Sequence, residues 1–291
     1  MIDSSDRVHV RTVKFALGVI VAFGITIAGA VPKAAAPTAH VLLVMLENKG
    51  YQKTLGACSA DPYFCSLAKS YASITGYVGI GHPSLPNYLE VTAGTNEGCT
   101  SDSCATGRWQ GDLMQQLIAN SIPFVLYMES MPSPCFKSKA SQYVVSHNPG
   151  PYFTDDNCST TDVAYPGASG LVTALSNYDF VWISPNQQDN MHSGTVQKGD
   201  AWLKANLPGV LTSSWFTGGN ATVIVTMDEN DNGGTPANQI PMVVISSNAA
   251  GKGNLALGGS HFTTLGAIET VFGLPLLGRA TREASLTALF G

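Results

Sequence analysis

The chain has 291 residues, of which 44% are hydrophobic and 12% charged, and its formal net charge at pH 7 is −5. This composition is typical of one globular domain with a large core and excludes a mostly disordered chain. Lysines and arginines form no basic stripe, which argues against a nucleic acid as partner. Because the overall charge gives an anionic substrate no attraction, a protein of this kind that handles phosphate would need bound cations.

The first 36 residues have the pattern of a targeting segment. Arg7, Arg11 and Lys14 precede an uncharged run over 15–32, and small-residue cleavage patterns follow. We interpret residues 1–36 as a signal peptide. The alternative is an uncleaved membrane anchor, since the run approaches the roughly 20 residues that a membrane span needs. Either interpretation places a single domain, 37–291, outside the cytoplasm, and the second would also attach it to a membrane.

Short apolar runs bounded by turn residues recur along the chain and predict buried strands. They cover residues 40–46, 122–128, 178–184, 221–227 and 240–246. Stretches with helical spacing lie between them, over residues 85–94, 111–121, 169–178, 199–211 and 262–273. Because strands and helices alternate, we predict an α/β fold, a mainly parallel sheet with helices on both faces. The loop-rich segments 96–110 and 129–168 are interpreted as insertions in this domain.

Six cysteines, none of them in a CxxC pattern, occur in the part of the chain that follows the targeting segment. In an exported protein an even number of cysteines suggests three disulfides, with buried free thiols as the alternative. Pairing between neighbours in the sequence is the simplest hypothesis, although other pairings stay open. It joins Cys58 to Cys65, Cys99 to Cys104, and Cys135 to Cys158.

Polar side chains follow three of the predicted strands. Glu47-Asn48 comes after the first, a segment with Asp189 and His192 comes after 178–184, and Asp228-Glu229 comes after 221–227. Ligands of parallel sheets bind beyond the carboxyl ends of the strands. Each acidic residue alone would be an ordinary loop or cap residue. Together they predict a carboxylate cluster, which repels itself unless protons or metal ions neutralise it.

Ser84 stands between two prolines, and Leu85-Pro86 after it fits the first turn of a helix. A hydroxyl at a helix N-terminus is well placed to hold a phosphate oxygen. No GxSxG pattern surrounds Ser84, which argues against an α/β-hydrolase. A serine needs a base or a metal to become a nucleophile, and a metal is the simpler route here. On local sequence alone, a helix cap without chemistry is the favoured interpretation of Ser84.

Several motifs in fixed order resemble those of one family. They include VLLVMLENKGYQKTLG, GHPSLPNYLEVTAGT, HNPGPYF, FVWISPNQQDNMHSGT, VIVTMDENDNGG and GSHFTTLGAIETVFGLPLLGRA, and they span 41–280. This set resembles the phosphoesterase family of bacterial and fungal acid phosphatases and phospholipases C, in the alkaline phosphatase superfamily. The resemblance implies an alkaline phosphatase-like three-layer α/β/α fold and one or two divalent metal ions as cofactors.

The resemblance also implies roles for single residues. Ser84 matches the nucleophile. The first metal site matches Glu47, Asn48, Asp228 and Glu229, and a second matches Asp189, His192 and His261. His82 is a candidate to contact substrate or protonate the leaving group, with a purely structural loop role as the alternative. We interpret His147 as a structural loop residue. Two departures are Met227, where the family often has tryptophan, and Ser146, where lysine is usual; Asp231 is either a further ligand or a solvated turn residue.

These features predict an exported, metal-dependent phosphoric ester hydrolase that forms a phosphoserine. The substrate would be a small phosphate monoester, as in an acid phosphatase, or a phospholipid, as in a phospholipase C. Two other classes stay open, a non-catalytic exported binding protein and a metal-independent serine esterase. Chelation would separate the last from the others. The sequence does not indicate an oligomeric state.

Overall fold

The structure is a computed structural model that describes residues 39–231, 238–248, 253–282 and 284–290. The predicted targeting segment lies outside the described residues. Within the described part of the chain, no helix is long and apolar enough to cross a membrane.

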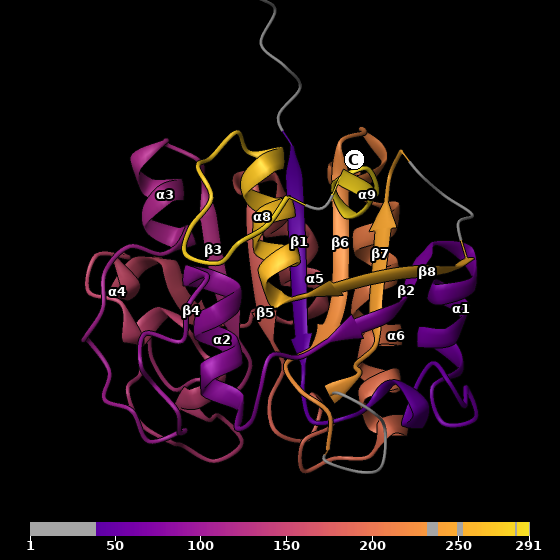
Figure 1. Ribbon diagram of the computed structural model, residues 1–291, viewed down its shortest axis with the longest axis horizontal. Helices are drawn as coiled ribbons and strands as arrows, with labels where there is room; N and C mark the ends of the chain where they lie inside the picture. The colour runs from indigo at the N-terminus through magenta and orange to yellow at the C-terminus, as the bar shows by residue number, and fades with distance from the viewer. Residues whose placement is uncertain (1–38, 232–237, 249–252, 283, 291) are drawn as a thin grey trace, which may run out of the picture. The chain divides into compact units, whose positions relative to one another are not determined.

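An eight-stranded sheet forms the centre of the domain, in the order β4-β3-β5-β1-β6-β7-β2-β8 (Figure 1). The strands are β1 (His40–Leu46), β2 (Ala72–Val78), β3 (Phe124–Met128), β4 (Asp162–Ala164), β5 (Phe180–Ser184), β6 (Ala221–Met227), β7 (Met242–Ser246) and β8 (Gly253–Ser260). Strand β7 is antiparallel to both of its neighbours, and the other pairs are parallel. The predicted mainly parallel sheet is confirmed.

The strands that the sequence missed lack long apolar runs. β2 (ASITGYV) and β8 (GNLALGGS) contain glycine and polar residues, and β4 has three residues. All three lie toward the edges of the sheet, where β4 and β8 are the outermost strands. A strand there is covered less completely and does not need the continuous apolar sequence of a central strand.

Helices cover both faces of the sheet. They are α1 (Pro62–Ser70), α2 (Ser84–Ala93), α3 (Leu113–Ala119), α4 (Cys158–Thr161), α5 (Gly167–Ala174), α6 (Val196–Thr212), α7 (Ser214–Thr217), α8 (His261–Val271) and α9 (Ala284–Thr287). Short 3-10 helices cover Tyr51–Lys53, Val145–His147, Gly150–Tyr152 and Leu175–Asn177. Helices α2 and α8 pack together on one face, and α1, α5 and α6 pack on the other (Figure 1).

The register of the two central strands sets the position of the acidic residues. Leu46 at the end of β1 pairs with Met227 at the end of β6. The next residue of each strand, Glu47 and Asp228, therefore lies at the same edge of the sheet. All side chains of β6 and those of β1 after His40 are buried, as central strands covered on both faces require.

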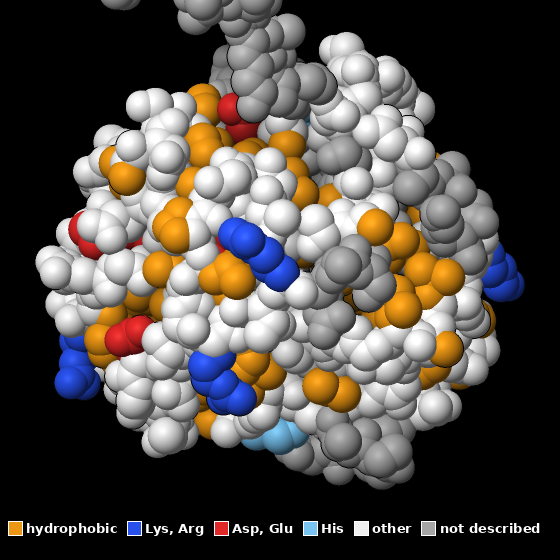
Figure 2. Space-filling model, turned by 45° about the horizontal axis from the view of Figure 1, so that its top comes forward, with side chains coloured by type: hydrophobic (Ala, Val, Ile, Leu, Met, Phe, Trp, Pro, Cys, Tyr) orange, Lys and Arg blue, Asp and Glu red, His pale blue; other side chains and the backbone are white. Residues whose placement is uncertain are grey.

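The three predicted disulfides are confirmed. The Cα–Cα distances are 5.7 Å for Cys58–Cys65, 6.1 Å for Cys99–Cys104 and 5.3 Å for Cys135–Cys158. The last two bonds hold the loop-rich insertions, and the first joins the start of α1 to the loop before it. On the face shown in Figure 2, charged side chains are sparse and scattered among polar and hydrophobic ones.

Candidate active site

Glu47, at the end of β1, is fully buried and accepts two hydroxyl hydrogen bonds from helix α2. Ser84 Oγ donates to its Oε2 at 3.1 Å, and the Tyr88 hydroxyl donates to its Oε1 at 2.6 Å. Residues four apart lie on the same face of a helix, so one turn of α2 delivers both hydroxyls. Glu47, which directly follows β1, and the predicted nucleophile Ser84 are thus in direct contact.

Ser84 is the first residue of α2 and follows a cis peptide bond between His82 and Pro83. Asn87 orders this turn: its Oδ1 accepts from the backbone N–H groups of Ile80 and Gly81, and its Nδ2 donates to the carbonyls of Gly81 and Pro83. One side chain therefore fixes the loop that presents Ser84.

The residues after β6 complete the carboxylate cluster. Asp228 Oδ1 accepts from the backbone N–H of Asn48 at 3.2 Å and of Glu229 at 2.6 Å. Glu229 Oε2 pairs with His82 Nδ1 at 2.8 Å. Asn87 Nδ2, in helix α2, lies 3.4 Å from the same Glu229 oxygen. Glu47, Ser84, Asp228 and Glu229 thus converge at one edge of the sheet.

Burial without compensating charge raises the pKa of each acid in this cluster. The pKa of Glu47 is raised well above its usual value by burial first and by the charge of Asp228 second. Burial raises the pKa of Asp228 to about 6, and burial followed by the charge of Asp228 raises that of Glu229 to about 9. Without a cation, the cluster would bind protons.

The oxygens of these residues are chemically suited to a divalent cation, but among the described residues the potential ligand group that contains Glu47 joins it to His147 and His192, not to Asp228 and Glu229. Asp228 Oδ2 is buried and has no hydrogen-bond partner among the described residues. Three carboxylates and a hydroxyl give the oxygen-rich ligand set that Ca²⁺, Mg²⁺ or Mn²⁺ prefers. An ion at this point would neutralise the carboxylates and use the unpaired oxygen.

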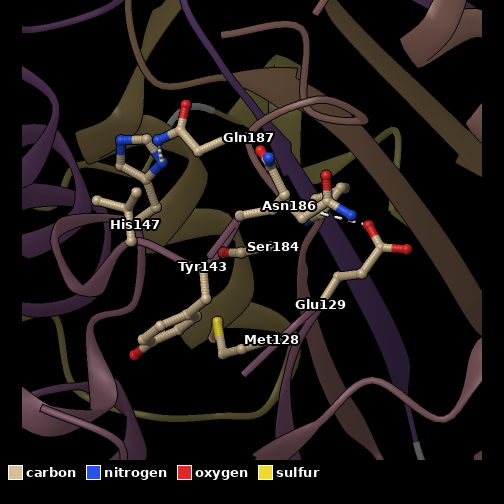
Figure 3. A pocket seen from close by; sticks show the side chains of 10 residues that line it. Met128, Glu129, Tyr143, His147, Ser184, Asn186 and Gln187 are labelled. Carbon is tan, nitrogen blue, oxygen red and sulfur yellow. Dashed lines mark hydrogen bonds between the residues drawn. The ribbon is translucent and has the colours of Figure 1, made fainter. Parts of the chain in front are cut away.

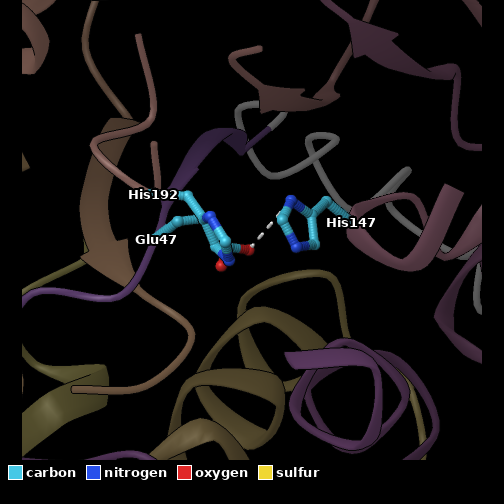
Figure 4. Close-up of side chains that lie close together, drawn as sticks. All are labelled: Glu47, His147 and His192. Atoms are coloured by element: carbon cyan, nitrogen blue, oxygen red, sulfur yellow. Dashed lines mark ion pairs between the residues drawn. The ribbon is translucent and has the colours of Figure 1, made fainter. Parts of the chain in front are cut away.

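Two histidines approach the cluster from other segments. His147, in the 3-10 helix Val145–His147, has its Nδ1 3.5 Å from Glu47 Oε1 and stacks on Tyr88. One ligand atom each from Glu47, His147 and His192 lie within 4.8 Å of one another (Figure 4). Burial, and then the charge of His192, lowers the pKa of His147 to about 3. His147 is therefore neutral and has the protonation state of a metal ligand.

A small pocket adjoins His147 between β3, β5 and the segment 142–147 (Figure 3). Met128, Tyr143 and Ser184 line it together with Glu129 and Gln187. Gln187 Nε2 lies 3.4 Å from His147 Nδ1. The pocket thus lies between His147 and the ends of β3 and β5.

Other predicted ligands have different partners in the structure. Asp189 accepts a hydrogen bond from Asn186 Nδ2 at 2.9 Å and lies 3.9 Å from Lys198 Nζ. His261 Nε2 donates to the Asp228 carbonyl at 2.6 Å. Asp231 pairs with Lys53. Within the described residues, Asp189, His192 and His261 do not form one ligand group, and their assignment to a second metal stays a prediction.

Several residues of this site are not predicted from the sequence. His147 is interpreted there as a structural loop residue, and Asn87 and Tyr88 are not among the candidate residues. Their signal is the spacing from Ser84, three and four residues, which puts them on its face of the helix. Asp102, inside the Cys99–Cys104 loop, was also missed; its Oδ1 accepts from the Leu85 backbone N–H at 2.8 Å. No local pattern marks that contact.

Comparison with known proteins decides the family. The model of the Phosphoesterase family matches residues 57–275. The chain belongs to the Phosphoesterase family. A phosphatidylinositol-3-phosphatase of Mycobacterium tuberculosis is 32% identical to it over 90% of this chain and 88% of that protein. A probable acid phosphatase of Kluyveromyces lactis is 25% identical over 84% of this chain and 60% of its own length.

Solved structures agree on the fold of this family member. An alkaline phosphatase superfamily protein of Vibrio parahaemolyticus aligns with a TM-score of 0.58 at 12% identity, over 84% of this chain and 70% of that chain. The lipoteichoic acid synthase LtaP of Listeria monocytogenes aligns with a TM-score of 0.59 at 11% identity, over 88% and 76%. The fold is that of the alkaline phosphatase superfamily. With the family match and its phosphatase relatives, the protein is a hydrolase acting on phosphoric esters.

Proposed function

We propose that the protein is an exported, metal-dependent phosphomonoesterase that uses Ser84 as its nucleophile. One observation carries the proposal: the Ser84 hydroxyl starts α2 and hydrogen-bonds to buried Glu47, beside Asp228 and Glu229. A structural serine would not need three carboxylates around it. A cation bound by these carboxylates would lie next to the Ser84 hydroxyl.

Glu47, Asp228 and Glu229 would hold the cation, with Asn48 beside them as the resemblance implies. Such an ion lowers the pKa of a nearby hydroxyl and neutralises charge on the transferring phosphoryl group. Because Ser84 Oγ donates to Glu47 Oε2 at 3.1 Å, its hydroxyl lies where this effect is largest. Asn87, through its hydrogen bonds to the Gly81 and Pro83 carbonyls, keeps Ser84 at the helix start.

The reaction has two steps. In the first, Ser84 Oγ gives its proton to the Glu47 carboxylate and bonds to phosphorus, the bond from phosphorus to the leaving oxygen breaks, and the leaving oxygen takes a proton. His82 is our candidate donor, since Glu229 holds its Nδ1 and its side chain is partly exposed. In the second step, water gives a proton back to His82 and attacks the phosphoserine, while the proton on Glu47 returns to Ser84 Oγ as inorganic phosphate leaves.

The relatives support a monoester rather than a phospholipase C substrate. One is named a phosphatidylinositol-3-phosphatase, and two fungal relatives are named as acid phosphatases. All of these names describe removal of a terminal phosphate. We therefore propose small phosphate monoesters or the terminal phosphate of a lipid headgroup as substrates. Three disulfides support an oxidising compartment outside the cytoplasm.

The test compares Ser84→Ala with wild type on p-nitrophenyl phosphate and on bis-p-nitrophenyl phosphate, with and without chelator. We expect wild type to prefer the monoester and to lose activity on chelation. Ser84→Ala should lower kcat by roughly 10³ or more, because the covalent route is removed. The free energy of unfolding should change by only about 1 kcal/mol, the value of one hydrogen bond.

A matched control is Ser66→Ala, which removes the hydroxyl that donates to the Tyr63 carbonyl in α1, away from the cluster. This variant should keep wild-type kcat. Mass spectrometry of acid-quenched wild type should find phosphate on the peptide that contains Ser84. If Ser84→Ala keeps more than about a tenth of wild-type kcat, Ser84 is not the nucleophile, since tenfold is only ~1.4 kcal/mol of barrier.

A further inference from the structure

A second acidic cluster joins two segments of the loop-rich insertions. The chain before α3 runs beside the chain after the 3-10 helix Gly150–Tyr152: Thr154 N donates to the Trp109 carbonyl at 3.0 Å, and Gly111 N donates to Asp155 Oδ2 at 3.3 Å. One carboxylate oxygen each from Asp112, Asp155 and Asp156 lie within 4.8 Å of one another.

The oxygens in this cluster are buried and short of partners. Asp112 is 0% exposed and Asp156 1% exposed. Asp112 Oδ1 accepts from the Gln115 N–H at the start of α3, but its Oδ2 has no hydrogen-bond partner in the described part of the chain. The same holds for both oxygens of Asp156 and for Asp155 Oδ1. Four carboxylate oxygens are therefore left without a donor.

No basic side chain compensates these acids. Burial is the largest cause that raises the pKa values of Asp112 and Asp156, and the charged groups that act on them are the other aspartates of the cluster. None of the ion pairs found among the described residues involves Asp112, Asp155 or Asp156. Buried carboxylates in this state are stable only when protons or a cation neutralise them.

We propose that Asp112, Asp155 and Asp156 form a binding site for a hard divalent cation of the Ca²⁺ type, separate from the catalytic cluster. The ligand set contains only carboxylate oxygens. Such oxygens bind hard cations such as Ca²⁺, whereas softer metals prefer nitrogen or sulfur ligands. Oxygens that each lie about 2.3–2.6 Å from one Ca²⁺ are no more than roughly 5 Å apart, and this cluster meets that condition. The unpaired oxygens of Asp112 and Asp156 provide the free lone pairs.

The ion would connect the start of α3 to the segment 145–156, which carries His147 at one end and Asp155 and Asp156 at the other. That segment continues from Val145–His147 through Gly150–Tyr152 to Asp155. His147 is within it and lies beside Glu47. Calcium at this cluster would thus stabilise the fold and hold the loop that carries His147, while taking no part in the reaction.

The experiment titrates metal-stripped protein with CaCl₂ at pH 7.5 and measures the melting temperature and the heat of binding. Four forms are compared: wild type, Asp156→Asn, Asp228→Asn and Asp61→Asn. The third removes a catalytic carboxylate, and the fourth removes another fully buried aspartate outside the cluster. Asp155→Asn, at a half-buried position, replaces Asp156→Asn if that variant does not fold.

We expect calcium to raise the melting temperature of wild type, Asp228→Asn and Asp61→Asn. Asp156→Asn or Asp155→Asn should weaken calcium binding at least tenfold and lose the shift. An equal shift in the variants of the cluster would overturn the proposal. So would the lack of any shift in wild type, which would mean that shared protons alone neutralise the three aspartates.

Discussion

The loops that follow β6 and β5 both carry acidic residues at the same edge of the sheet, yet they use them differently. Asp228 comes directly after β6, is fully buried, and contacts Asn48 and Glu229. Asp189 comes five residues after β5, is partly exposed, and turns to Asn186 and Lys198. The sheet thus fixes the first residue beyond a strand, while a residue farther along takes its direction from its own turn.

The most severe test of this contrast is Asp228→Asn. The asparagine Oδ1 could still accept from Asn48 and Glu229, so the loop should keep its shape. The lost charge should remove the catalytic cation and lower kcat/KM by at least about 10³-fold, or ~4 kcal/mol. Elemental analysis and p-nitrophenyl phosphate hydrolysis, measured on one preparation, check both effects.

The control for Asp228→Asn is Asp231→Asn in the same loop. Asp231 pairs with Lys53 on the surface, and exposed ion pairs of this kind contribute little. This variant should keep its metal and stay within about threefold of wild-type kcat/KM. A large loss in both variants would mean that the whole loop, and not the buried carboxylate, supports activity.

His82→Asn tests the partner of Glu229 on this side of the site. If His82 protonates the leaving oxygen, the variant should lose roughly 10²–10³-fold in kcat on an alkyl phosphate, whose alkoxide needs the proton. p-Nitrophenolate leaves without that help, so the loss on p-nitrophenyl phosphate should be several times smaller. Equal losses on the two substrates would show that His82 only holds the loop through its contact with Glu229.

The same contrast explains how far the sequence alone could reach. Central strands with continuous apolar runs were predicted, and the acidic residues directly after β1 and β6 could be placed because parallel strands end together. Glycine-containing β2 and β8 gave no such run. The contacts of His147 with Glu47 and of Asp102 with Leu85 join segments that are distant in sequence, and their geometry depends on how loops pack.

His261→Gln tests the histidine whose Nε2 donates a hydrogen bond to the Asp228 carbonyl, directly after β6. His261 is fully buried and neutral, and burial lowers its pKa to about 4. An unfolded histidine binds its proton near pH 6.5, so between pH 6.5 and 4 the unfolded state holds more protons. Folding stability from this residue is therefore present above pH 6.5 and is lost as pH falls.

The expected loss is on the order of 2–3 kcal/mol between pH 7 and pH 4 for wild type relative to His261→Gln. Urea unfolding in the presence of chelator, at several pH values, measures it without a contribution from bound metal. Parallel pH curves for the two proteins would mean that burial does not keep His261 neutral in the folded state.

The smallest effect is expected for Asp189→Asn, on the other side of the comparison. Its carboxylate faces Asn186 and the partly exposed Lys198, and such a pair contributes about 0–1 kcal/mol. We expect kcat/KM within about threefold of wild type and an unchanged metal content. A loss of 10²-fold or more, with one equivalent of metal missing, would restore Asp189 as a ligand and would require its loop to turn inward when metal binds. Measuring His192→Ala beside it separates the two residues of this loop, because His192 already lies next to Glu47 and His147 while Asp189 does not.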